Sequence, residues 1–140
     1  MLSLFALLQS APLAAPAPNL ADQLNVAIWN DLQLNAMIGN GNWIASLWYN
    51  AGREDGEPDL HIRGLRCRPH QEGYRCAFRL LRDGGVRQLY GEDAPDRLAC
   101  TAIFVRDAEE GGFTVVHLRP GPRGGHSRTQ LRCRRLRRAE

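Results

Sequence analysis

The chain has 140 residues and a net charge of +3, with 44% hydrophobic and 24% charged residues. This length suits one domain and leaves no room for two independent cores, and the composition argues against wholesale disorder. All 18 basic residues are arginine. Residues 1–122 carry 11 arginines against 14 acidic residues, whereas residues 123–140 carry 7 arginines against Glu140 alone. We therefore expect an anionic partner to bind near the C-terminal end.

The first predicted element is an export signal over residues 1–18. Residues 2–8 form an apolar run that is too short to span a bilayer as a helix, and an Ala/Pro-rich stretch follows. No positive charge precedes the run, and the alternative is a disordered leader on a cytoplasmic protein. Residues 19–140 are expected to form a single α+β domain with a basic C-terminal strand and tail. The mature chain is expected to have no transmembrane segment.

An amphipathic helix is predicted over residues 20–38, because apolar residues recur there at helical spacing and Gly39 follows. Asn19 is the expected N-cap of this helix. Residues 43–52 fit either a short helix or a strand, and we favour a helical turn or an irregular apolar segment.

From residue 60 onward the apolar residues recur with a period of two, which is typical of strands. The expected strands cover residues 60–68, 74–82, 86–90, 97–106, 113–119 and 129–136. Gly64 is a candidate bulge in the first of them. The pattern predicts an α+β fold in which the N-terminal helix packs on a four- to five-stranded antiparallel meander. This order of elements is similar to cystatin-like and nuclear-transport-factor-like folds, and the likeness implies no activity.

The four cysteines are an even number in a small chain with a predicted export signal: Cys67, Cys76, Cys100 and Cys133. That combination favours two disulfides in an oxidising compartment, periplasmic or extracellular. Three pairings are possible, and the hairpin pattern favours Cys67–Cys76 together with Cys100–Cys133. In a loop-entropy model these closures contribute roughly 2.7 and 3.8 kcal/mol to stability. The alternative is a zinc site that combines His70 and His126 with Cys67, Cys76 and Cys133, but the paired Cys-x2-Cys spacing is absent.

Alternation along the predicted strands places arginines on the face opposite the apolar residues and cysteines. Antiparallel sheets commonly leave one face in water, so these guanidinium groups could form a basic surface for phosphates, lipid head groups or acidic protein. The alternative is an ordinary solvated face in a chain that lacks lysine. The anion-binding candidates are Arg66, Arg68, Arg75, Arg79, Arg132, Arg134, Arg135, Arg137 and Arg138.

A groove lined by Trp43 and Trp48 is the other candidate contact surface. The sequence offers little evidence of a catalytic motif. Neither Ser46 nor Ser127 lies in a Gly-x-Ser-x-Gly elbow, and the adjacent pair of His126 and Ser127 does not build a triad. We expect no catalytic residue, no cofactor and no metal site.

The sequence thus predicts a small exported bacterial protein that binds an unidentified partner, either an anionic ligand or an acidic protein surface. Two alternatives stay open. The first is a cytoplasmic nucleic-acid-associated protein that uses residues 123–138, although no aromatic residues are interleaved there for base stacking. The second is a small hydrolase in the cavity between helix and sheet, which requires a histidine within reach of a carboxylate.

Overall fold

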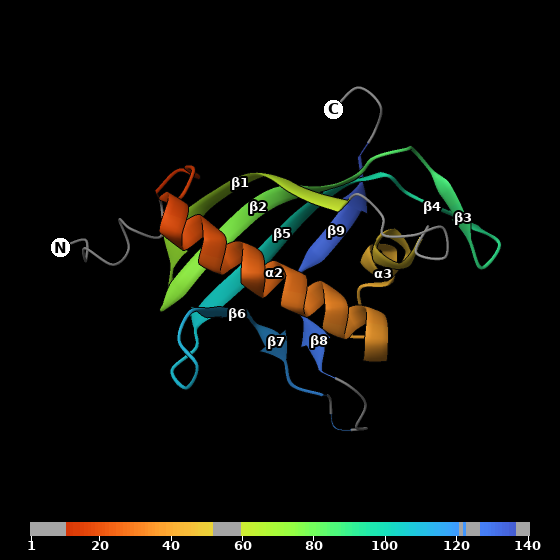
Figure 1. Ribbon diagram of the computed structural model, residues 1–140. Helices are drawn as coiled ribbons and strands as arrows, with labels where there is room; N and C mark the ends of the chain where they lie inside the picture. Colours follow the sequence, from red (N-terminus) through yellow and green to blue (C-terminus); the bar gives the residue numbers. More distant parts are fainter. Residues whose placement is uncertain (1–10, 52–59, 121, 123–126, 137–140) are drawn as a thin grey trace.

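A computed structural model of the chain describes residues 11–51, 60–120, 122 and 127–136. The elements are α2 (Pro18–Ile38), α3 (Trp43–Asn50), β1 (Leu60–His70), β2 (Gly73–Arg82), β3 (Arg87–Leu89), β4 (Glu92–Ala94), β5 (Arg97–Arg106), β6 (Phe113–Val115), β7 (His117–Leu118), β8 (Arg128–Thr129) and β9 (Arg132–Arg135). A five-stranded antiparallel sheet of β1, β2, β5, β6 and β9 carries α2 across one face (Figure 1). The predicted α+β fold with an N-terminal helix is confirmed.

The long helix α2 begins two residues before the predicted start. Its N-cap is Ala17 and Pro18 lies in the first turn, so the expected N-cap, Asn19, is already helical. Proline suits the first helical position because its φ is preset and its missing N–H would have no helical partner there. The helix ends before Gly39, whose φ of 76° is readily adopted by glycine. Of the two interpretations favoured for residues 43–52, a helical turn or an irregular segment, the helical one is found, as α3 over Trp43–Asn50.

The last strand of the sheet, β9, pairs with β5 and not with β6. β1, β2 and β5 pair in chain order, but β6 and β9 then share the remaining edge of β5. β9 pairs with residues 98–101 and β6 with residues 104–106, since the ten residues of β5 offer room for both. The sheet therefore departs from a simple meander at β9. The expected strand over residues 113–119 is divided into β6 and β7, and β3 pairs with β4 in a separate ribbon.

The expected bulge at Gly64 is present in β1. The register between β1 and β2 shifts between Arg63 and Arg66, and Gly64 has a φ of 69°. Before the shift Arg63 lies opposite Arg79, and after it Arg66 lies opposite Ala77. The bulge thus brings both of these β1 arginines to the same face of the sheet.

Both predicted disulfides are confirmed. Cys67–Cys76 joins β1 to β2 and Cys100–Cys133 joins β5 to β9, with Cα atoms 4.1 Å apart in each. Cys67 exchanges its backbone hydrogen bonds with Ala14 rather than with β2, so it faces Cys76 at a non-hydrogen-bonded position, where strands approach most closely. No sulfur is left for the zinc alternative. Two disulfides are compatible with an oxidising compartment.

The predicted export signal lies partly outside the described residues, which begin at residue 11. In the described part, Ala14 bridges the edge of β1 at Cys67, and the carbonyl of Leu13 accepts a hydrogen bond of 3.2 Å from Arg66 Nη2. No described helix combines the length and the apolar character that crossing a membrane would require.

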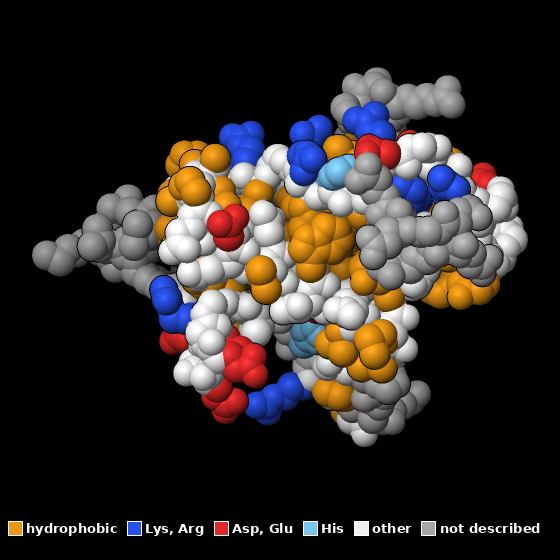
Figure 2. Space-filling model, in the orientation of Figure 1, with side chains coloured by type: hydrophobic (Ala, Val, Ile, Leu, Met, Phe, Trp, Pro, Cys, Tyr) orange, Lys and Arg blue, Asp and Glu red, His pale blue; other side chains and the backbone are white. Residues whose placement is uncertain are grey.

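The hydrophobic core lies between the helices and one face of the sheet. Its largest fully buried side chains include Trp48 and Phe104, and the ring of Trp48 stacks on that of Trp29 with centroids 6.1 Å apart. Neither α2 nor α3 contains arginine. On this side of the molecule, apolar and uncharged polar side chains cover most of α2, and the basic ones lie mainly around the rim (Figure 2).

Candidate functional site

The register of the sheet aligns arginines of different strands on the face opposite α2. Directly opposed residues point to the same side of a sheet. Rows of such residues cross the sheet as Arg63–Arg79–Ala99–Arg134, Arg66–Ala77–Thr101–Arg132 and Arg68–Arg75–Ile103. The predicted arginines of β1 and β2 therefore share one face with Arg132 and Arg134 of β9. We call this surface the arginine face.

A shallow depression of about 550 Å³ lies on the arginine face. Its floor includes Ala77 of β2 together with Ala99 and Thr101 of β5, which are small side chains at adjacent positions of two rows. Leu136 adds an apolar group after the end of β9. The depression exists because short side chains occupy the middle of the sheet while long ones flank them.

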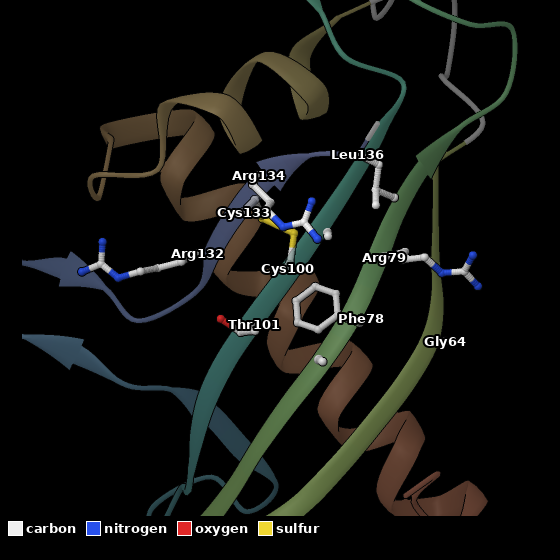
Figure 3. Close-up of a pocket in the computed structure, with 11 residues that line it drawn as sticks. Gly64, Phe78, Arg79, Cys100, Thr101, Arg132, Cys133, Arg134 and Leu136 are labelled. Carbon is white, nitrogen blue, oxygen red and sulfur yellow. A yellow bond between two sulfur atoms is a disulfide. The ribbon is translucent and has the colours of Figure 1, made fainter. Parts of the chain in front are cut away.

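Arginines flank the depression on both sides. Figure 3 views the sheet with α2 behind it: Arg134 reaches toward β5, Arg79 extends over β1, and Arg132 points away from β5. Gly64 leaves room for Arg79, because a Cβ at this position would lie 3.3 Å from Nε of Arg79. Arg79 and Arg134 oppose Ala99 from its two sides. Their backbones are therefore two strand spacings apart, or roughly 10 Å, with the small side chain of Ala99 between them.

The strands of this sheet carry arginine but no acidic side chain. The sequences of β1, β2, β5 and β9 contain arginine but neither aspartate nor glutamate. One of these arginines, Arg82, lies outside the arginine face: it is 5% exposed and its Nη1 donates to the carbonyl of Pro95. Burial and the nearby charge of Arg87 lower the pKa of Arg82, and Asp96 opposes the shift. The exposed Arg66 and Arg134 of the arginine face donate hydrogen bonds to backbone carbonyls, of Leu13 and of Arg135 respectively.

The remaining predicted arginines are placed differently. Arg135 opposes Leu98, whose side chain is buried, and its Nη2 donates to the carbonyl of Asp93 at 3.1 Å. Because neighbours along a strand alternate, Arg135 cannot share a face with Arg134. Arg137 and Arg138 lie outside the described residues.

The two tryptophans of the predicted groove lie in different environments. Trp48 is 0% exposed and belongs to the core. Trp43 is 58% exposed, and its Nε1 donates to Oε2 of Glu92 at 3.3 Å. Trp43 lines a depression of about 380 Å³ beside the end of α2. Trp48 does not line this depression, so the two tryptophans do not share it.

A second polar cluster connects α2 to the short strands β7 and β8. The carboxylate of Asp31, in α2, is 2.5 Å from Nε2 of His117 and accepts a hydrogen bond of 2.7 Å from Oγ1 of Thr129. Nδ1 of His117 is 3.2 Å from Oγ of Ser127. In the sequence, Ser127 is paired only with its neighbour His126, and that pair builds no triad. The cluster leaves no local sequence pattern, because Asp31 is 86 residues away from His117.

A depression of about 150 Å³ borders this cluster. It is lined by Asp31 and His117 together with apolar side chains that include Leu34, Phe113 and Val115. The hydrolase alternative requires a histidine within reach of a carboxylate between helix and sheet, and this cluster meets that requirement.

Comparisons of the chain with protein-family models, with curated proteins and with solved structures find no match. The likeness to cystatin-like folds therefore rests on the order of elements alone. Within the part of the chain that the structure describes, no group of three His, Cys, Asp or Glu side chains is arranged to hold a metal ion.

Proposed function

We propose that this protein is a small exported binding protein, periplasmic or secreted, which binds an anionic amphiphile on the arginine face. The row Arg79–Ala99–Arg134 carries the proposal. Guanidinium groups bind carboxylates and phosphates through paired, charge-assisted hydrogen bonds. The small side chains between them offer an apolar floor for a short alkyl chain.

The choice of an amphiphile follows from the combination of charge and shape. Phosphate alone would leave the floor of Ala77 and Ala99 unused, although each CH₂ group placed on such a surface contributes up to about 0.8 kcal/mol. An acidic protein would need a contact area of about 800 Å² on each partner. A head group between Arg79 and Arg134, with its tail along the floor, uses the depression itself.

Export is supported by two features of the chain. Both disulfides join partners on neighbouring strands, and such bonds persist in oxidising compartments. The apolar run over residues 2–8, followed by an Ala/Pro-rich stretch, resembles the core and end of a signal peptide. Intact mass of the natively expressed protein, with and without reductant, tests both features together.

The binding test is a titration with octyl phosphate at low salt, followed by the backbone amide resonances of Ala77, Ala99 and Thr101. We expect saturable shifts at these positions. Replacing Arg79 and Arg134 together by glutamine should weaken binding at least tenfold, because each hydrogen bond to a charged group contributes about 1.5–3 kcal/mol. The variant Arg106→Gln makes one such Arg→Gln change at a site where the guanidinium lies 5.2 Å from the ring of Phe113. This control should keep the original affinity.

Matched ligands separate the contributions of head group and tail. Octanol lacks the charge and inorganic phosphate lacks the tail, so both should bind more weakly than octyl phosphate. Equal affinity for octanol, or unchanged affinity in the Arg79/Arg134 double variant, would contradict the proposal. Vesicles of phosphatidylglycerol, compared with phosphatidylcholine, distinguish a membrane lipid from a free amphiphile as the source of the anion.

The nucleic-acid alternative is less well supported by the described residues. It uses residues 123–138, of which 127–136 are described. β9 supplies arginines but no aromatic side chain on which a base could stack. DNA binding at about 50 mM salt, where counterion release favours it most, would revive this alternative.

A further inference from the structure

A serine, a histidine and an aspartate from three segments lie in one chain of hydrogen bonds. Asp31 belongs to α2, His117 begins β7, and Ser127 immediately precedes β8. An ionised carboxylate only accepts hydrogen bonds, so Asp31 selects the tautomer of His117 that carries its proton on Nε2. Nδ1 then has a lone pair that accepts the hydroxyl proton of Ser127 at 3.2 Å. In this arrangement Nδ1 of His117 lies within hydrogen-bond reach of the Ser127 hydroxyl proton.

The carboxylate of Asp31 is held in place from both of its oxygens. Thr129 Oγ1 donates to Oδ2 at 2.7 Å, and Asn40 Nδ2 approaches Oδ1 at 3.4 Å. The Asp31 side chain is 5% exposed, whereas that of His117 is 22% exposed. A buried, oriented carboxylate behind a partly accessible imidazole is the arrangement that stabilises an imidazolium during acyl transfer.

We propose that Ser127 is the nucleophile of a serine–histidine–aspartate site that hydrolyses small esters. The ring of His117 is turned relative to the familiar protease arrangement, since the serine meets Nδ1 and the carboxylate meets Nε2. The roles are unchanged by this exchange, because either ring nitrogen can act as the base while the other donates. The activity would be separate from amphiphile binding on the arginine face.

The reaction balances with water as the co-reactant. Ser127 Oγ attacks the ester carbonyl, and its proton passes to Nδ1 of His117 while Asp31 stabilises the imidazolium. The C–O bond to the alcohol breaks, and His117 returns the proton to the departing alkoxide. Water then attacks the acyl-serine with His117 as base, which releases the carboxylic acid and restores Ser127. The depression of about 150 Å³ beside His117 is lined by polar side chains, among them Asn30 and Asp31, as well as by apolar ones.

The test uses an alkyl fluorophosphonate, which loses fluoride when an activated serine forms the phosphonyl ester. We expect the intact mass to increase by one phosphonyl group, mapped to Ser127, and the increase to vanish in Ser127→Ala. Ser46→Ala is the matched control and should keep the label, because Ser46 lies in α3 and accepts a hydrogen bond from Asn50. The same variants are then compared in hydrolysis of p-nitrophenyl butyrate.

His117→Gln separates catalysis from structure. A general base contributes typically 10²–10⁴-fold, so labelling of Ser127 should slow by at least about 100-fold in a variant that keeps its disulfides and its melting temperature. No label on the wild-type protein would overturn the proposal without any variant being needed. A label that persists in Ser127→Ala would also overturn it. The labelling test is independent of the octyl phosphate test, because octyl phosphate is proposed to bind on the opposite face of the sheet.

Discussion

The two faces of β2 and β5 are made by alternate residues of the same strands, yet they differ in composition and exposure. The helix face carries both disulfides together with Phe78, Leu80 and Phe104, each at most 3% exposed. The opposite face carries arginines around a floor of small side chains. Because one face supplies the core and the covalent links, the other can hold a basic surface at little cost in stability. Four changes test how complete this division is.

The largest effect is expected from a pair of neighbours in β5. Phe104 is 0% exposed, so Phe104→Ala should lower the free energy of unfolding by about 3–5 kcal/mol through lost burial and a cavity. Ile103 points to the opposite face, opposes Arg75 and is only half-buried. Ile103→Ala should cost clearly less. Urea denaturation measures both, and equal costs would remove the distinction between the faces.

The next largest loss of stability is expected when a disulfide is removed. The disulfide that closes the longer loop should contribute more. Replacing Cys100 and Cys133 by alanine opens a separation of 33 residues and should cost about 3.8 kcal/mol, whereas the loss of Cys67–Cys76 should cost about 2.7 kcal/mol. Both double variants are compared by urea denaturation under non-reducing conditions. The opposite order would mean that strain or residual structure outweighs loop entropy.

A smaller effect is expected at the bulge that adjusts the arginine face. Gly64→Ala places a side chain at a φ of 69°, which should cost about 1–2 kcal/mol. The new Cβ would also lie 3.3 Å from Nε of Arg79 and displace that guanidinium. We therefore expect weaker octyl phosphate binding as well as a lower melting temperature. Unchanged affinity would show that the position of Arg79 does not matter for binding.

The smallest effect on stability is expected on the arginine face itself. Arg79→Gln and Arg134→Gln change exposed side chains, so each should alter the free energy of unfolding by less than about 0.5 kcal/mol. The same changes should weaken octyl phosphate binding, as argued above. A large loss of stability would show that these arginines support the sheet, and the two faces would then no longer divide stability from binding.

Several features were predictable because they depend on neighbours along the chain. The period of two in residues 74–82 assigned β2 and placed Arg75 and Arg79 opposite its apolar face, whereas apolar residues on both faces of residues 97–106 assigned β5 as a central strand. Glycine after an apolar periodic run located the end of α2. The even number of cysteines, with two of them nine positions apart across a hairpin, predicted the disulfides. Each of these is a local rule of backbone geometry or chain closure.

What only the tertiary structure decided depends on residues far apart in the sequence. The return of β9 to β5 creates the row Arg79–Ala99–Arg134, and no local pattern states which strand a final strand will join. The contact of Asp31 with His117 likewise requires α2 to cross the sheet at one particular place. Alternation tells which side of a strand a residue occupies, but packing of the whole chain determines which residues of other strands and helices lie beside it.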